Sequence, residues 1–284
     1  VNDFNARLVS VLFGMLTIVL AYFIGKEYSK TGGIISALFI SVFSLEVFFS
    51  RQARFYQLFQ LMFFLCIYLL YKSGENLNKT DFFSSSQNSQ KNKQRFVDKK
   101  KEDLYLIGSL IAFFIALNTH IAALVLAPFL IFHIFIFNKH KYLAIIPLIL
   151  LIKNYLPAVG LASNSPETVV NLADKYFAFT RNMKYLLMLF IPGALWAGLK
   201  KWKLTFLILL PSIVLLVGIF SLQIFALRYA YFFVFPLVIY SSVLTSFLYD
   251  ELGKLTIVLI LFLLIFPSNL FFPHTYVNII KPIS

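Results

Sequence analysis

Residues 50–57 of this 284-residue chain carry two arginines at the turn between two long apolar runs. A membrane hairpin does not need charged groups at its turn in order to fold, so Arg51 and Arg54 require an explanation. The arginine guanidinium is a planar fork of donors that fits the oxygens of a phosphate or a carboxylate. We therefore predict that Arg51 and Arg54 bind an anionic group, with Tyr56 as a supporting donor.

Glu46 lies just before this turn, near the predicted outer end of the preceding span. An unpaired carboxylate within a membrane span is unfavourable, so such residues usually pair or line a cavity. We predict that Glu46 orients Arg51 and Arg54, and it is also a candidate catalytic carboxylate. Gln57 and Gln60, three residues apart, extend a polar stripe into the next span. The alternative is that these side chains only fasten the hairpin.

Two further places combine polar groups with predicted span ends. His120 closes the polar trio at residues 118–120, where an imidazole can donate to a phosphate, act as a catalytic acid or base, or cap a helix. Arg228 and Tyr229 open a later span ahead of Pro236, which would kink that helix. We predict that Arg228 and Tyr229 contact the same anionic group, although snorkelling to the interface also explains Arg228.

The composition assigns these residues to a membrane protein. Of 284 residues, 60% are hydrophobic, 13% are charged and 34 are phenylalanine. The mean hydropathy of +0.83 lies outside the range of soluble domains. Apolar runs of about 15 to 20 residues recur along the chain, each long enough to cross most of a hydrocarbon core. Their backbones must satisfy their own hydrogen bonds, so we predict an all-α polytopic fold of about ten transmembrane helices. The predicted spans are 8–24, 33–49, 55–71, 104–118, 121–137, 142–156, 184–199, 204–222, 229–248 and 254–272.

The turns and the lysines predict the topology. One helix over residues 104–137 would be about 51 Å long, so we divide this stretch at the trio 118–120. With both termini outside, the inner segments hold 16 of the 25 lysines and arginines, in agreement with the positive-inside rule. Of these 16, 15 are lysine, whereas five of the nine outer ones are arginine. The positive-inside rule accounts for the inner lysines, whereas the arginine-rich outer set indicates a binding surface.

We predict a single transmembrane domain over residues 1–284 with two long connections. Residues 73–103 are rich in Ser, Asn, Gln and Lys and predict a flexible cytoplasmic loop, while residues 157–184 predict the longest outer loop. The charge of +13 follows from topology and does not predict nucleic-acid binding. The single cysteine, Cys66, is predicted to pack within a span. The sequence contains no metal-binding motif, Walker loop or dinucleotide fingerprint.

A series of short motifs resembles the GT-C superfamily of integral-membrane glycosyltransferases, of the protein-mannosyltransferase and aminoarabinose-transferase type. The first three motifs resemble the second membrane helix of that family, and the others resemble its later landmarks in the same order. The series covers most of the chain, and its order makes it more specific than any one motif. The motifs occupy residues 3–8, 12–14, 22–26, 50–56, 119–120 and 228–236.

This resemblance implies a polyprenyl-phosphate-linked sugar donor, a lipid, glycan or protein acceptor on the outer side of the membrane, and inverting transfer. It also implies that an outer carboxylate deprotonates the acceptor hydroxyl while cationic groups stabilise the departing lipid phosphate. Family members carry this acid on the first outer loop, after a first membrane helix, and the chain begins at Val1, downstream of both. Asp3 is not a convincing substitute, so we expect either that the base lies in a preceding N-terminal segment or that the activity is lost. A divalent metal requirement is open, and we expect a prokaryotic plasma membrane.

Two other functional classes are open at this point. A flippase or exporter of lipid-linked sugars would also need an apolar groove with arginines at one end. Transporters, however, tend to carry internal repeats and charges near mid-membrane, and neither is visible in this sequence. A non-catalytic membrane scaffold would fit a missing base but would leave the outer arginines unexplained. The sequence identifies neither the sugar nor the acceptor, and it does not give the oligomeric state.

Overall fold

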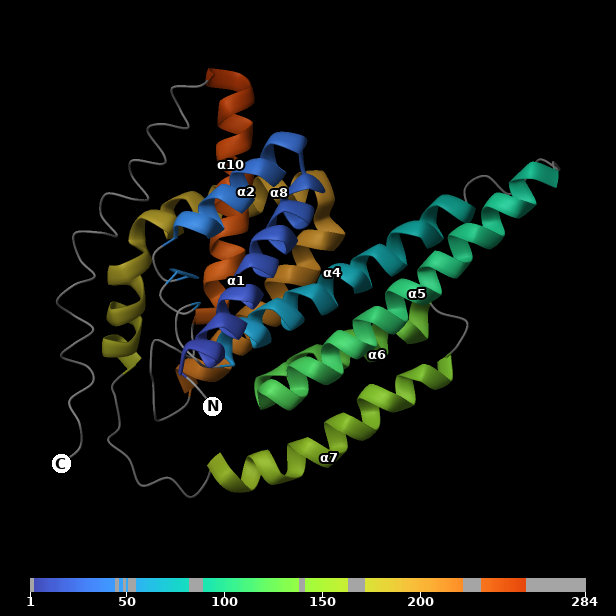
Figure 1. Ribbon diagram of the computed structural model, residues 1–284, viewed down its shortest axis with the longest axis horizontal. Coiled ribbons are helices and arrows are strands. Elements are labelled where there is room, and N and C mark those ends of the chain that lie inside the picture. Colours follow the sequence, from blue (N-terminus) through green and yellow to red (C-terminus); the bar gives the residue numbers. More distant parts are fainter. Residues whose placement is uncertain are drawn as a thin grey trace. The chain divides into compact units, whose positions relative to one another are not determined.

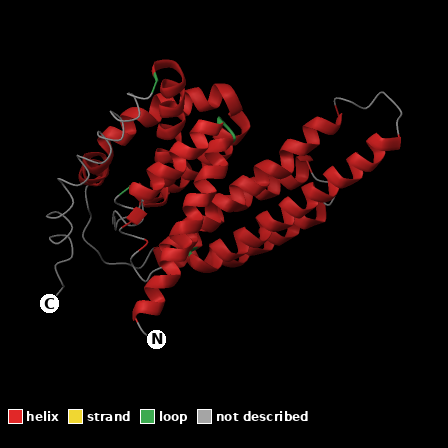
Figure 2. Cartoon of the chain, turned by 45° about the horizontal axis from the view of Figure 1, so that its top comes forward, coloured by secondary structure: helices red, strands yellow, loops and turns green. Residues whose placement is uncertain are grey.

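The computed structural model describes residues 3–43, 46–47, 50, 55–81, 89–137, 141–162, 172–221 and 231–253. Every regular element in this part of the chain is a helix, as Figure 2 shows, which confirms the predicted all-α class. Within the same part, five helices are long and apolar enough to cross a membrane, and two shorter helices are also apolar. The total of about ten spans and the outer position of both termini stay predictions.

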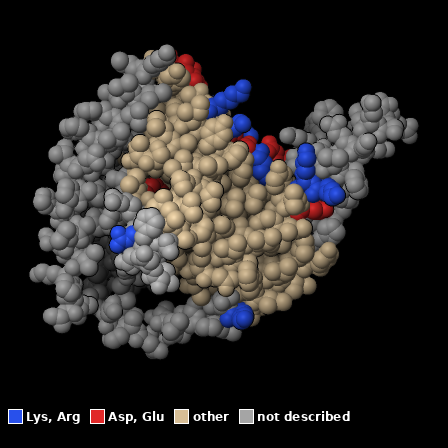
Figure 3. Space-filling view, viewed as in Figure 1, with Lys and Arg blue, Asp and Glu red and all other residues tan. Residues whose placement is uncertain are grey.

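An exposed apolar stripe identifies a surface that turns toward lipid. On α1 (Asp3–Lys26), exposed large side chains recur at three- and four-residue spacing, at Leu8, Leu12, Met15 and Val19. Such a stripe is unfavourable in water and is accommodated by hydrocarbon. Figure 3 shows few acidic or basic side chains among the described residues on the face that it draws. The chain is therefore an integral membrane protein.

The chain forms two compact units, which we describe separately. The first consists of Val1–Gln57, Thr168–Thr205 and Leu216–Ser284, and the second of Leu58–Glu167 and Phe206–Leu215. Helices α4 (Tyr56–Asp81) and α8 (Leu172–Ser221) contribute residues to both units.

In the first unit, α1 packs along α2 (Lys30–Val42), and α10 (Val234–Leu252) contacts both helices (Figure 1). Every residue from 231 to 243 is buried, so η3 (Tyr231–Phe233) and the first half of α10 lie at the centre of this unit. One hydroxyl connects the α1–α2 turn to α10. Ser29 Oγ caps α2 by accepting from the Gly32 amide at 2.8 Å, and it donates to Ser246 Oγ at 3.1 Å.

The helix α8 is interrupted at Lys201, whose backbone angles of φ −141° and ψ 68° are not helical. The predicted spans 184–199 and 204–222 lie on either side of this residue. The predicted separation of two helical segments is therefore confirmed, although the connection is a break of one residue rather than a loop.

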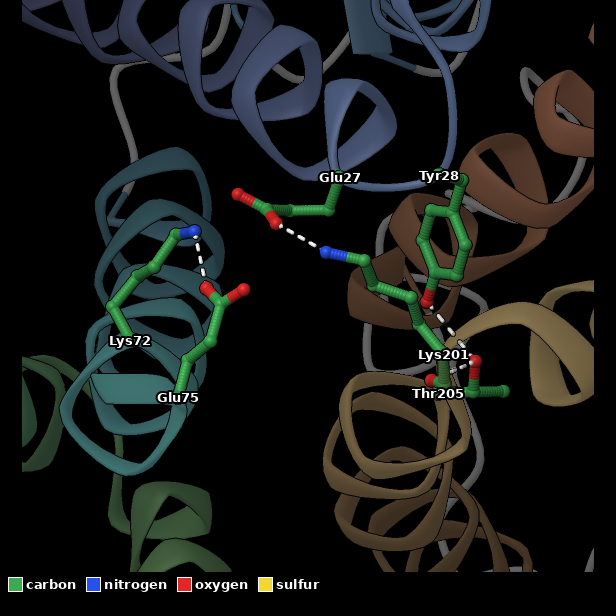
Figure 4. A network of polar contacts seen from close by, with 6 residues as sticks. All are labelled: Glu27, Tyr28, Lys72, Glu75, Lys201 and Thr205. Atoms are coloured by element: carbon green, nitrogen blue, oxygen red, sulfur yellow. Dashed lines mark hydrogen bonds and ion pairs between the residues drawn. The ribbon is translucent and has the colours of Figure 1, made fainter. Parts of the chain in front are cut away.

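Three contacts hold this break within the first unit. Lys201 Nζ lies 2.9 Å from Glu27 Oε2, and the hydroxyls of Tyr28 and Thr205 are hydrogen-bonded at 3.0 Å, as Figure 4 shows. Tyr240 of α10 donates to the Thr205 carbonyl at 3.3 Å. The α1–α2 turn, α8 and α10 are thus joined at one place by polar side chains.

The second unit contains most of α4 together with a series of shorter helices. Ser109 Oγ donates to the Cys66 carbonyl at 3.0 Å, and Cys66 is buried, in agreement with its predicted packing role. The predicted turn at residues 118–120 is confirmed, because one helix ends at Thr119 and the next begins at Ile121. The elements after α4 are α5 (Ser89–Thr119), η1 (Ile121–Val125), α6 (Leu126–Phe137), η2 (Lys141–Ala144) and α7 (Ile145–Ala162).

Helices extend into the predicted flexible loop at residues 73–103. Helix α4 continues to Asp81 and α5 begins at Ser89, so all described residues of this segment are helical. Lys, Glu and Gln favour helices even where no apolar core is available. An ion pair between Lys72 and Glu75, 2.7 Å long and visible in Figure 4, adds support between neighbouring turns. The cytoplasmic side of this segment stays a prediction.

Two other boundaries differ from the sequence prediction. Helix α7 reaches Ala162 and α8 begins at Leu172, so both enter the predicted outer loop 157–184. Conversely, α2 ends at Val42, because Phe43 adopts an extended backbone. The predicted span 33–49 is therefore not one continuous helix.

Gly193 marks a close approach of two helices in the first unit. A Cβ atom built on Gly193 of α8 would overlap the Tyr240 carbonyl oxygen of α10. We expect Gly193→Ala to lower the thermal unfolding midpoint by several degrees in detergent, because overpacking costs about 1–3 kcal/mol. Gly198→Ala on the same helix is the matched control, since its Cβ would meet no described side chain or neighbouring backbone closer than 4.0 Å. Equal midpoints for the two variants would contradict the close packing.

Candidate functional site

Glu46 is the centre of a buried polar cluster in the first unit. Tyr231 Oη donates to Glu46 Oε2. Gln57 Nε2 lies 3.3 Å from the same carboxylate oxygen and 3.2 Å from the Glu46 carbonyl oxygen. It also lies 2.5 Å from Tyr231 Oη. The exposed fractions of Glu46, Gln57 and Tyr231 are 4%, 0% and 2%, and we call these three residues the Glu46 cluster.

Segments far apart in the sequence meet at the Glu46 cluster. Glu46 lies between α2 and α4, Gln57 is the second residue of α4, and Tyr231 is the first residue of η3. Helix α1 approaches the same place, because a Cβ atom built on Gly14 would lie 2.9 Å from Ser50 Cβ and 4.0 Å from Gln57 Cδ. A larger residue at position 14 would push α1 away, so this glycine permits the close packing of α1 against the cluster.

The cluster places a carboxylate where water is excluded. An ionised carboxylate offers about four acceptor sites, and Gln57 and Tyr231 direct their donors to Oε2. Gln57 Oε1 is also buried and accepts no hydrogen bond from any residue that the structure describes. The cluster therefore has the acceptor capacity to orient a cationic side chain.

The predicted site residues are described in part. Four of them lie outside the described residues, namely Arg51, Arg54, Arg228 and Tyr229. Tyr56 is buried, and its ring packs against Phe55 with centroids 4.9 Å apart. Within the described ranges, no group of three or more His, Cys, Asp or Glu side chains could hold a metal ion. The anion-binding roles of these four residues and of Tyr56 stay predictions.

Tyr231 is a residue of the cluster that the sequence does not single out. Residues 228–233 read Arg-Tyr-Ala-Tyr-Phe-Phe, so two tyrosines are available two positions apart. The 3-10 turn Tyr231–Phe233 at the start of α10 determines where the Tyr231 hydroxyl lies. The sequence signal that could have identified Tyr231 is that it is a second tyrosine close to Arg228. The 3-10 turn that positions it cannot be predicted from apolar periodicity.

His120 belongs to the second unit and caps a helix there. Its Nδ1 accepts from the Ala122 amide at 3.1 Å, and its ring packs on Phe59 with centroids 5.2 Å apart. Burial lowers the pKa of His120 below its ordinary value of 6.5, so the ring is neutral near pH 7 with its proton on Nε2. The capping interpretation is therefore confirmed. A catalytic or donor role for His120 stays a prediction, and it would use Nε2.

The His120 cap predicts a pH-dependent stability. Because the pKa of His120 is lower in the folded protein than its ordinary 6.5, the unfolded chain takes up the proton first. The contribution of His120 to stability is complete above pH 6.5 and decreases as the pH falls below this value. We expect His120→Asn to keep the cap and lose this dependence, and His120→Ala to lose about 1 kcal/mol at pH 7.5. Thermal unfolding of all three proteins at pH 7.5 and 5.5 tests this, and equal pH slopes would contradict it.

The comparisons with known proteins bear on the same region. The model of the dolichyl-phosphate-mannose-protein mannosyltransferase family matches residues 1–85. This match includes α1, α2, the predicted turn at residues 50–57 and all of α4, and it confirms the resemblance to GT-C glycosyltransferases over that part of the chain. No curated protein and no solved structure matches the chain.

Proposed function

We infer that this chain belongs to the dolichyl-phosphate-mannose-protein mannosyltransferase family of GT-C integral-membrane glycosyltransferases. We propose that it transfers a sugar from a polyprenyl-phosphate donor to an acceptor on the outer side of the membrane. The family match over residues 1–85 and the long apolar helices support this class. The family description names mannose, whereas the sugar and the lipid, glycan or protein acceptor of this chain have to be identified by experiment.

The observation that carries the proposal is the contact between two segments that bear arginine. Gln57 follows Arg54 by three residues, and Tyr231 follows Arg228 by three residues. Successive Cα atoms are about 3.8 Å apart, so covalent connectivity keeps each arginine Cα within about 11 Å of its neighbour in the Glu46 cluster. The hydrogen bond between Gln57 and Tyr231 thus supports a shared anion site for both segments.

Guanidinium groups at this place suit the chemistry of a phosphate leaving group. When the bond between the sugar and the phosphate breaks, negative charge develops on the phosphate oxygens, and preorganised cations stabilise it. In our proposal Arg51, Arg54 and Arg228 hold this phosphate, and the Glu46 carboxylate orients the guanidinium groups. Tyr56 and Tyr229 are supporting donors in the same proposal.

The burial of Glu46 favours a positioning role over that of the catalytic base. A general base has to come within hydrogen-bond distance of the acceptor hydroxyl. Glu46 is only 4% exposed, and the side chains of Gln57 and Tyr231 contact its carboxylate. We therefore assign it to the phosphate half of the reaction and assign no base among the described residues.

A transfer assay in proteoliposomes tests the proposal. Purified full-length protein, including any segment that precedes Val1, is incubated with labelled polyprenyl-phosphate sugars, beginning with mannose, and with lipid and peptide acceptors. Appearance of the label in an acceptor supports the glycosyltransferase. Movement of the intact sugar lipid across the bilayer without transfer would instead identify a transporter, and the absence of both would leave a scaffold. Either of the last two results would overturn the proposed function.

A further inference from the structure

A second surface of the first unit lies on α8, outside the proposed transfer site. Exposed apolar side chains recur along this helix at three- and four-residue spacing, which places them on one face. Before the helix break at Lys201, this stripe consists of Met188, Ile191, Leu195 and Leu199. The next exposed apolar residue after the break is Trp202, which is 65% exposed. This face is suited to hydrocarbon, and it ends in an indole and a group of lysines.

Lysines and indoles are paired at this end of the stripe. Lys200 Nζ lies 5.6 Å from the centroid of the Trp196 ring, and Lys203 Nζ lies 5.8 Å from the centroid of the Trp202 ring. The Trp196 ring in turn packs on Phe247 of α10, with centroids 4.2 Å apart. The ammonium groups are thus held beside two aromatic rings. We call residues 196–203 the basic–indole segment.

The charges of this segment are only partly balanced within the described structure. Lys201 pairs with Glu27 at 2.9 Å. Among the residues described, neither Lys200 nor Lys203 forms an ion pair with a carboxylate, and both remain exposed. A tryptophan at a span end prefers the depth of the lipid headgroups, and lysines beside it extend toward phosphate groups. Two positive charges at that depth are attracted more strongly to a headgroup with a net negative charge than to a zwitterionic one.

We propose that the basic–indole segment binds the headgroup of an anionic phospholipid. The acyl chains lie along the stripe of Met188, Ile191, Leu195 and Leu199, and Lys200 and Lys203 contact the phosphate. Each lysine near an anionic membrane surface increases the local affinity about fivefold. The inference requires only that α8 is in the membrane, and it is independent of sugar transfer.

The two tryptophans of the chain are both in this segment, so intrinsic fluorescence reports on it directly. The protein is placed in nanodiscs that contain either brominated phosphatidylglycerol or brominated phosphatidylcholine at equal mole fraction, with unbrominated lipid of the other kind. We expect brominated phosphatidylglycerol to quench the fluorescence at least about twofold more strongly than brominated phosphatidylcholine. The reason is that each lysine increases the affinity for the anionic lipid about fivefold. Trp202→Phe assigns the signal, because only Trp196 then remains.

Charge-removing variants decide the proposal. Lys200→Gln with Lys203→Gln should abolish the preference for phosphatidylglycerol, whereas Lys141→Gln, an exposed lysine of the second unit, should retain it. Unchanged emission spectra in unbrominated nanodiscs verify that the double variant is folded. Equal quenching by both lipids in the parental protein, or a preference that survives in the double variant, would overturn the proposal. Neither result would affect the transfer assay.

Discussion

Arg54→Ala is expected to reduce sugar transfer from a polyprenyl-phosphate donor about tenfold or more. A charge-assisted contact with the leaving phosphate is worth roughly 1.5–3 kcal/mol, and this contact is lost together with the guanidinium. Arg54→Lys keeps a point charge but loses the planar fork, so we expect an intermediate rate. The measurement is the initial rate of transfer in proteoliposomes, at several donor concentrations.

The matched control for Arg54→Ala is Lys153→Ala. Lys153 is an exposed residue of α7 and one of the nine lysines and arginines predicted on the outer side, and its loss should leave the transfer rate unchanged. Both variants are first shown to insert and to unfold at the parental temperature. Parental transfer by a correctly folded Arg54→Ala protein would show that the arginine does not hold the phosphate.

Tyr231→Phe is expected to lower kcat/KM for the donor about tenfold while leaving the KM for the acceptor unchanged. The substitution removes one hydroxyl, and Glu46 then loses a donor that contacts its buried carboxylate. A hydrogen bond to a charged group contributes about 1.5–3 kcal/mol, so the carboxylate should orient its cationic neighbours less well. Steady-state kinetics with donor and acceptor varied separately distinguish this effect from a general loss of active protein.

Tyr240→Phe, in the adjoining helix α10, is the matched control. Tyr240 is also fully buried, but its hydroxyl donates to a neutral acceptor, the Thr205 carbonyl. We expect this variant to lose about 1 kcal/mol of stability and to keep the parental kcat/KM. If both tyrosine variants reduce transfer in proportion to their loss of stability, the Glu46 cluster has no positioning role beyond the support of the fold.

The helices were largely predictable because apolar runs leave few alternatives in lipid. The break at Lys201 lies between spans 184–199 and 204–222, where lysines interrupt the apolar run. The helical ends were less predictable. Residues 73–81 and 89–103 have too few apolar side chains for a core, yet their good helix formers continue α4 and α5. A loop and a solvated helix can have the same composition, so local hydrophobicity does not separate them.

The candidate site was predictable only for residues that are unusual in their own segment. Glu46 and Gln57 stand out because each is polar within or beside an apolar run. Tyr231 does not stand out in a run rich in aromatic residues. Its partner Glu46 is 185 positions away, so their contact depends on the packing of α10 within the first unit. A contact between residues so far apart in the chain cannot be predicted from the spacing of residues in one sequence.

The polar contacts of the α1–α2 turn also set an order for the biogenesis of the first unit. Glu27 meets Lys201 across 174 residues, and Ser29 meets Ser246 across 217 residues. At about 5–20 residues per second, a ribosome needs roughly 10 to 40 s to make the intervening chain. During this interval the α1–α2 turn lacks the partners that α8 and α10 later supply. These contacts of the first unit can therefore form only after α8 and α10 have been synthesised.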